Sequence, residues 1–215
     1  MAAGIQDKFR KIFKESKYKD WIIGGIIILI ALVGYIVYKN VSKPRTNPEA
    51  ERIFMQSFLL YLYRNDTLTS VEGWKEVSLR YPNTIWGKRA LYFLGFYYMS
   101  RGDYEKAKGY FKDFLKSGLK DRFLKAGAFI NLASCEANLG AYRKASDYAL
   151  KAAEILDYKS FRGYFYYKAA IYSKMAMDYK KALDILEKFD YKGHFLQKEA
   201  SRLKTELKLL INKGG

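Results

Sequence analysis

The sequence predicts an all-α protein: a single N-terminal transmembrane helix, followed by an α-solenoid of about three to four helix pairs and a C-terminal capping helix. Three observations predict this fold class. One stretch near the N-terminus is uniformly apolar, the rest of the chain has helical periodicity, and three windows of that part align in register. We therefore expect residues 1–20 to form a basic cytoplasmic tail, 21–38 the transmembrane helix, 39–47 a linker and 48–215 the solenoid.

The apolar stretch 21–38 reads WIIGGIIILIALVGYIVY and contains no charged side chain. A helix of this length rises roughly 27 Å, close to the hydrocarbon core of about 30 Å. Trp21 at one end and Tyr35 and Tyr38 at the other match the interfacial aromatic belt. A buried core helix is disfavoured because no polar face exists, and a cleaved signal peptide because no small-residue cleavage site follows. These residues predict an uncleaved signal anchor.

The flanks of this stretch predict its orientation. Six Lys and Arg residues precede it, and four follow between Lys39 and Arg52. An excess of basic residues marks the cytoplasmic side. We therefore expect a single-pass protein of the inner (cytoplasmic) membrane, with its N-terminus in the cytoplasm and its C-terminal domain in the periplasm. The basic flanks would lie near anionic lipid.

Composition argues against several classes of function. The 39 Lys and Arg residues exceed the 22 Asp and Glu residues, but the lysines are spread over the chain and no nucleic-acid-binding motif occurs, which disfavours nucleic acid as a partner. The only cysteine, Cys135, and the only histidine, His194, exclude a disulfide framework and a His-rich metal centre. We expect Cys135 to be buried and His194 to lie on the surface. We expect no catalytic, cofactor-binding or metal-binding residue and no enzymatic activity.

The solenoid is expected to begin at Asn47-Pro48. Asn47 can cap a helix, Pro48 fits the first helical position, and the acidic Glu49 and Glu51 suit the positive end of the helix dipole. This first helix is expected to run to residue 64. A second helix would end near Pro82, which breaks the periodicity.

The repeats follow in the windows 90–111, 128–149 and 165–186, which superpose with steps of 38 and 37 residues. All three windows place small residues where the two helices would meet, and the first two also place a glycine in the turn between the helices. Glycine at residues 102 and 140 allows a positive φ in the turn. The small residues are Gly95, Ala133 and Ala170 in the first helices, and Ala107, Ala145 and Ala182 in the second helices.

These windows resemble the tetratricopeptide repeat (TPR), a helix–turn–helix unit. The first window matches the TPR pattern as Leu94-Gly95-x2-Tyr98 and Ala107-x3-Phe111. The second and third windows keep fewer of its positions, and the longer period implies lengthened turns between repeats. The order of parts is similar to that of bacterial envelope TPR proteins, including the YfgM-type ancillary subunits of the Sec translocon.

This resemblance implies a membrane-anchored scaffold that binds protein partners in the cell envelope, with the Sec translocon or a periplasmic chaperone as candidate partners. An adaptor in cell division or outer-membrane assembly is the alternative within the same class. A structural subunit of a membrane complex without a peptide-binding groove is the alternative from another class.

TPR arrays bind ligands along the inner side of their first helices. The register of Gly95 and Ala133 predicts an aromatic and apolar groove that suits an extended or helical apolar peptide. The alternative is that the protein itself fills this groove, for example with the C-terminal helix 195–211 and its apolar stripe. The residues predicted to line the groove are Arg89, Tyr92, Phe96, Met99, Ile130, Ser134, Tyr164, Tyr167, Ile171 and Lys174.

Overall fold

The computed structural model describes residues 27–36, 46–64 and 66–213 of the chain. It divides into two compact units, Met1–Pro44 and Arg45–Gly215. The described part of the first unit, 27–36, is a helix with exposed side chains. The described part of the second unit consists of helices and turns and contains no β-strand. The structure is therefore consistent with the all-helical character of the predicted fold class.

The transmembrane helix of the predicted fold class is a wrong prediction. Over the ranges 27–36, 46–64 and 66–213, no helix has both the length and the apolar character needed to cross a membrane. Of the predicted span, the structure describes the helical residues 27–36. The other residues of the predicted span, 21–26 and 37–38, lie outside the described residues. The tail 1–20 and most of the linker, 39–45, do so as well.

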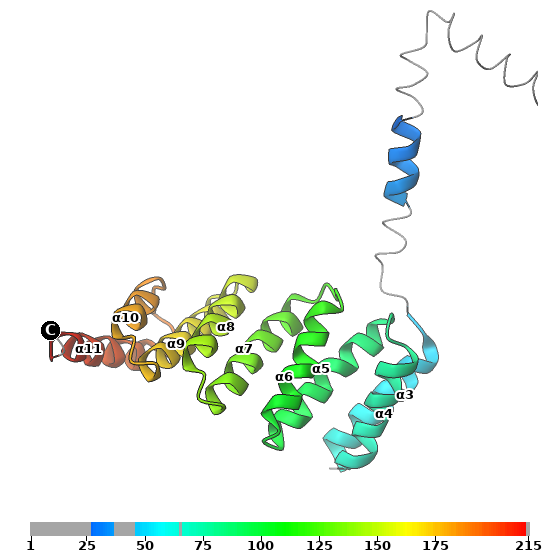
Figure 1. Cartoon of the computed structure of the whole chain (residues 1–215), viewed down its shortest axis with the longest axis horizontal. Helices are drawn as coiled ribbons and strands as arrows, with labels where there is room; N and C mark the ends of the chain where they lie inside the picture. The colour runs from blue at the N-terminus through cyan, green and yellow to red at the C-terminus, as the bar shows by residue number, and fades with distance from the viewer. Residues whose placement is uncertain (1–26, 37–45, 65, 214–215) are drawn as a thin grey trace, which may run out of the picture. The chain divides into compact units, whose positions relative to one another are not determined.

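The helices of the unit Arg45–Gly215 follow one another in a single row (Figure 1). The main contacts join helices that are neighbours in sequence, and others join α3 to α5 and α5 to α7. This arrangement is consistent with an α-solenoid of four helix pairs and a final helix. Its elements are α3 (Pro48–Leu59), the π-helix η1 (Leu60–Arg64), α4 (Thr67–Arg80), α5 (Ile85–Ser100), α6 (Tyr104–Lys116), α7 (Arg122–Asn138), α8 (Tyr142–Ile155), α9 (Lys159–Met175), α10 (Tyr179–Glu187) and α11 (Gln197–Lys213).

Side-chain caps set most of the helix starts. The predicted start of the solenoid is confirmed, because the Asn47 side chain accepts a hydrogen bond of 3.0 Å from the Ala50 amide and Pro48 is the first helical residue. Such a cap satisfies a backbone N–H that has no partner within the helix. Five further helices, α4, α5, α6, α7 and α10, carry the same kind of cap, from Asp66, Thr84, Asp103, Asp121 and Asp178.

The predicted small residues lie where helices approach closely. A Cβ atom added to Gly95 of α5 would lie 2.8 Å from the Phe111 ring of α6, so no larger residue fits without a shift. The five predicted alanines are completely buried, which confirms the predicted helix contacts: Ala107, Ala133, Ala145, Ala170 and Ala182.

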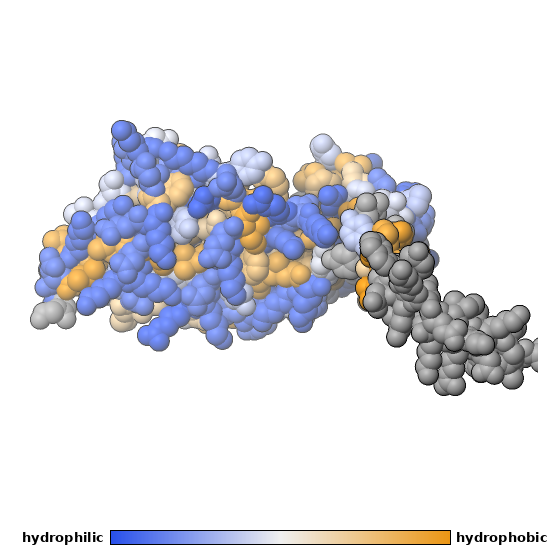
Figure 2. Space-filling view, turned by 90° about the horizontal axis from the view of Figure 1, so that it is seen from above, coloured by the Kyte–Doolittle hydropathy of each residue, from blue (hydrophilic) through white to orange (hydrophobic). Residues whose placement is uncertain are grey.

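The final helix covers the last pair. Ala200, Leu203 and Leu207 of α11 are buried in one cluster with residues of α9 and α10, as the apolar stripe predicts. The helix begins at Gln197, two residues later than expected, so Phe195 and Leu196 belong to the preceding turn. On the face of the unit that Figure 2 shows, hydrophilic residues cover most of the surface and hydrophobic residues lie in smaller areas between them.

Candidate functional site

The residues of the predicted groove all lie on α5, α7 and α9, the first helices of three pairs. The structure does not bring them together in one continuous open groove. It divides them into three groups with different surroundings: one packed within α5, α6 and α7, one against α11, and one at an open pocket between α7 and α9.

The α5 group is largely packed. The centroid of the Tyr92 ring lies 5.7 Å from that of the Phe111 ring and 5.5 Å from that of the Phe114 ring, both on α6. Its hydroxyl accepts a 3.4 Å hydrogen bond from the Asn131 side chain of α7, and burial raises the pKa of this hydroxyl. Tyr92 therefore holds three helices together instead of facing a ligand.

The other members of this group differ in exposure. Met99 is half-buried against the same cluster as Tyr92. Arg89 reaches Asp121 at the start of α7 in an ion pair of 3.6 Å. Phe96 is the exception, because 39% of it is exposed. Most of this part of the predicted groove is occupied by contacts within the protein.

The C-terminal group faces α11. Tyr167, Ile171 and Lys174 of α9 line a cavity of about 360 Å³ together with Leu203 and other residues of α11. Lys174 also forms an ion pair with Glu206 of α11. At this end, the predicted groove residues and the C-terminal helix line one cavity together.

The third group borders an open pocket of about 350 Å³, which we call the aromatic pocket. Ile130 of α7 and Tyr164 of α9 are the predicted groove residues in its lining. The remaining predicted residue, Ser134, donates to the backbone oxygen of Ile130 at 3.1 Å, within its own helix. The other residues that line the pocket come from α7, α9, the end of α8 and the turn before α11, and they are Phe123, Gly127, Leu156, Ser160, Phe161, Phe165 and Phe195.

Exposed aromatic rings form much of this pocket. Phe123 is 52% exposed, Phe161 46% and Phe195 67%. The rings of Phe123 and Phe161 lie 6.2 Å apart edge to face, and Phe161 stacks on Phe165 at 6.3 Å. Single exposed apolar residues are common on proteins, but a cluster of them around a hollow typically marks an interaction site.

His194 fixes one wall of the aromatic pocket. Its Nδ1 accepts a 3.0 Å hydrogen bond from the Leu196 amide, and its Nε2 lies 3.0 Å from the backbone oxygen of Ser160 on α9. Because a carbonyl oxygen only accepts, Nε2 is the donor and the ring is the neutral Nε2–H tautomer. The Phe195 ring stacks on the imidazole at 4.4 Å.

The expectation of a surface histidine is therefore wrong, because His194 is only 7% exposed. Its position between Ser160 and Leu196 attaches the turn before α11 to α9. Gly163 makes this approach possible, since a Cβ atom there would lie 2.5 Å from Nε2. Phe123, Phe161 and Phe195 are not among the residues predicted from the sequence. Phe123 and Phe161 stand in the first turns of α7 and α9, which carry predicted groove residues further along.

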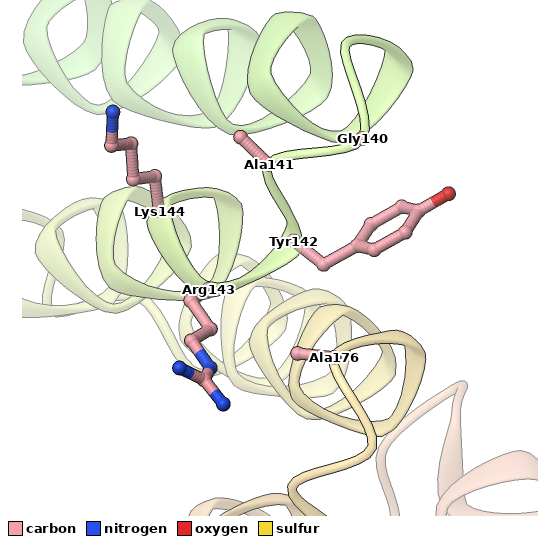
Figure 3. Close-up of a pocket in the computed structure, with 6 residues that line it drawn as sticks. All are labelled: Gly140, Ala141, Tyr142, Arg143, Lys144 and Ala176. Carbon is pink, nitrogen blue, oxygen red and sulfur yellow. The ribbon is translucent and has the colours of Figure 1, made fainter.

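A second hollow, of about 400 Å³, lies between the α7–α8 turn and the end of α9. Figure 3 shows the side chains of Arg143 and Lys144 extending in different directions and the Tyr142 ring pointing away from both. These polar groups do not converge on one point. We therefore consider the aromatic pocket to be the candidate functional site.

Metal-binding and nucleophilic chemistry have little support in the described part of the chain. No group of three or more His, Cys, Asp or Glu side chains lies close enough to hold a metal ion within 27–36, 46–64 and 66–213. Cys135 is buried, as expected, and its burial raises the pKa of the thiol to about 11. A thiol of this kind is a poor nucleophile at neutral pH.

No protein-family model matches the chain, and no curated protein matches its sequence. The TPR resemblance and the translocon or chaperone partners that it implies therefore stay predictions.

Proposed function

We propose that the unit Arg45–Gly215 is a TPR-like helical-repeat scaffold that binds a polypeptide partner through its aromatic pocket. The observation that carries this proposal is the cluster of exposed rings from Phe123, Phe161 and Phe195 around one hollow. Burying such rings on binding contributes favourably to the free energy of association, and aromatic anchors of this kind dominate many protein interfaces.

The chemistry of the lining favours a polypeptide side chain over a polar small molecule. Sites for small ligands carry a few converging polar groups that fix the orientation of the ligand. Here the only polar side chains in the lining are the Ser160 hydroxyl and the Tyr164 phenol. The backbone oxygen of Ser160 already accepts a hydrogen bond from His194. An apolar or aromatic side chain from a partner fits this lining without leaving polar groups unpaired.

A binding role also agrees better with the polar residues than catalysis does. The single histidine uses both ring nitrogens in contacts that attach the turn before α11, so it has no nitrogen left for proton transfer.

The rival proposal is a structural subunit without an open site. The contacts of Tyr92 with α6 and of Lys174 with α11 favour that rival for the two ends of the predicted groove, but not for the aromatic pocket.

The test is a peptide-binding measurement with the full chain. A fluorescein-labelled peptide with a central Leu-Phe pair between glutamines serves as the probe, and fluorescence polarisation reports its affinity. We expect the double substitution Phe161→Ala and Phe195→Ala to weaken binding at least about tenfold, since two anchors are removed. The thermal midpoint should fall only modestly, because Phe161 is 46% and Phe195 67% exposed and neither ring belongs to the buried core.

Phe96→Ala is the matched control, because Phe96 is an exposed ring on α5 that does not line the pocket. It should leave the affinity unchanged. Equal affinities of the wild-type chain and the double variant would contradict the proposed site, and no binding by the wild-type chain would favour the structural subunit.

A further inference from the structure

Three basic residues stand close in sequence to residues that line the aromatic pocket. Arg122 precedes Phe123 at the start of α7, Lys159 precedes Ser160 at the start of α9, and Lys192 lies in the turn that leads to His194 and Phe195. The Lys159 ammonium donates to the backbone oxygen of Lys192 at 2.9 Å, which joins two of these positions directly. We call Arg122, Lys159 and Lys192 the basic rim.

The three carboxylates closest in sequence to the basic rim form no ion pair with its side chains. The carboxylate of Asp157 forms an ion pair of 2.8 Å with Arg162. The carboxylate of Asp121 forms an ion pair with Arg89 and caps α7. Asp190 accepts a hydrogen bond of 2.9 Å from the amide N–H of Lys192. Among the described residues, no carboxylate lies within ion-pair distance of a side chain of the rim.

The rest of the unit reinforces this field. Residues 46–215 contain 30 Lys and Arg residues against 19 Asp and Glu residues. Like charges around a hollow with apolar walls attract oppositely charged groups and repel cationic ones.

The rim also has donors left for a ligand. The Arg122 side chain donates from Nε and Nη2 to the backbone oxygen of Ile155, which leaves N–H groups on Nη1. The Lys159 ammonium has three protons and makes one hydrogen bond, to Lys192. The contacts with carbonyl oxygens therefore position these side chains without neutralising them.

We propose that the aromatic pocket takes an apolar or aromatic side chain from a polypeptide segment whose flanking residues are acidic. This rests on the proposed function and adds the charge of the partner to it. The apolar side chain enters the ring cluster of Phe123, Phe161 and Phe195, and carboxylates on either side reach the basic rim. Segments with basic flanks are rejected by like-charge repulsion.

The experiment compares three labelled peptides of equal length with the same central Leu-Phe pair, flanked on each side by two Glu, two Gln or two Lys residues. Fluorescence polarisation with the full chain measures each affinity at 50 mM and 300 mM NaCl. We expect the Glu peptide to bind about tenfold more tightly than the Gln peptide at 50 mM NaCl, and the Lys peptide to bind most weakly. The advantage of the Glu peptide should shrink at 300 mM NaCl, because salt screens exposed charges.

Variants of the rim assign the effect to its residues. Arg122→Gln with Lys159→Gln should weaken the Glu peptide about fivefold and leave the Gln peptide unchanged. Lys192→Gln should also weaken the Glu peptide. It removes no side-chain contact of the fold, because Lys159 binds only the backbone oxygen of Lys192. Lys112→Gln is the control, since Lys112 is an exposed cation of α6, a helix that contributes no residue to the pocket lining.

The outcomes separate the two proposals. If the Gln and Glu peptides bind equally tightly, or the rim variants leave the Glu peptide unaffected, the acidic partner is wrong and the aromatic pocket remains as a binding site. If none of the three peptides binds, the proposed function is wrong and the acidic partner with it.

Discussion

Met177 and Gly140 occupy the same place in two successive helix turns, and both have a left-handed backbone, with φ of 61° and 78°. Gly102 has the same conformation in the preceding pair, with φ of 79°. The predicted turn glycines are thus confirmed, and the third repeat adopts the same turn without one. A residue with a Cβ atom is strained in this region by about 1–2 kcal/mol.

The strain at this turn predicts that Met177→Gly stabilises the protein. The Met177 side chain is 78% exposed, so its removal loses little packing. The relief of strain is partly offset by the greater freedom of glycine in the unfolded chain. We expect a gain of about 0.5–1 kcal/mol in the free energy of unfolding, measured by urea denaturation.

Met177→Ala is the control, because alanine keeps the Cβ atom. It should give no gain. An equal gain from alanine and glycine would show that the exposed side chain, and not the backbone conformation, lowers the stability of the wild-type protein.

A missing helix cap predicts a second stabilising change, Ala141→Asp. Asp103 and Asp178 cap α6 and α10 at the equivalent position, but Ala141 leaves α8 without a side-chain cap. The backbone of Ala141, with φ −85° and ψ 58°, is close to that of Asp103, with φ −83° and ψ 71°. The new carboxylate should therefore reach the amide of Lys144 and add about 1 kcal/mol to the free energy of unfolding.

Chemical denaturation measures this gain, and Asp103→Ala provides the converse, with an expected loss of about 1 kcal/mol. A stable Ala141→Asp variant with no gain, alongside the expected loss at Asp103, would mean that the α8 start does not accept a cap.

The parts of the fold that could be predicted depend on local or periodic constraints. The cap at Asn47 and the turn glycines at 102 and 140 depend on backbone conformation within a few residues. The burial of the repeated alanines depends on helix contacts that recur with every pair. Each of these leaves a residue pattern in the sequence, which is why these features could be predicted. The change from α-helix to π-helix at Leu60, within the predicted first helix 48–64, has no such pattern.

The candidate site could be predicted only in part because it depends on the helices' mutual placement. Ile130 and Tyr164 were found from the repeat register, but Phe195 lies in a turn outside the repeats and reaches the pocket because His194 is attached to Ser160. Tyr92 has the spacing of a groove residue, yet it packs between α6 and α7. The apolar stretch 21–38 predicts a membrane span from its local sequence, but no helix of the described residues has the length and apolar character of a span.

The buried thiol predicts a loss of stability at alkaline pH. Burial raises the pKa of Cys135 from 9.0 to about 11, so between these values the unfolded chain loses the proton and the folded chain keeps it. The buried neutral thiol makes its full contribution to the free energy of unfolding below pH 9, and this contribution is lost as the pH rises towards 11. For this single group, the free energy of unfolding should fall by at most about 1.4 kcal/mol per pH unit.

Urea denaturation between pH 8 and pH 11 measures this dependence, and Cys135→Ala should make it shallower. Burial also raises the pKa of Tyr191, whose hydroxyl donates to the backbone oxygen of Gly163, so a residual slope above pH 10 is expected in the variant. An identical slope with and without the thiol would contradict the assignment to Cys135.

The packing of Tyr92 predicts that it acts on stability and not on binding. Tyr92→Ala removes ring contacts with Phe111 and Phe114 and should lower the free energy of unfolding by about 2–4 kcal/mol. Tyr92→Phe keeps these contacts and loses only the 3.4 Å hydrogen bond from Asn131, so it should cost less than about 1 kcal/mol. Urea denaturation of both variants distinguishes ring packing from the hydroxyl group. Peptide affinity of Tyr92→Phe should equal that of the wild-type chain, and a marked loss of affinity would place Tyr92 in the binding surface after all.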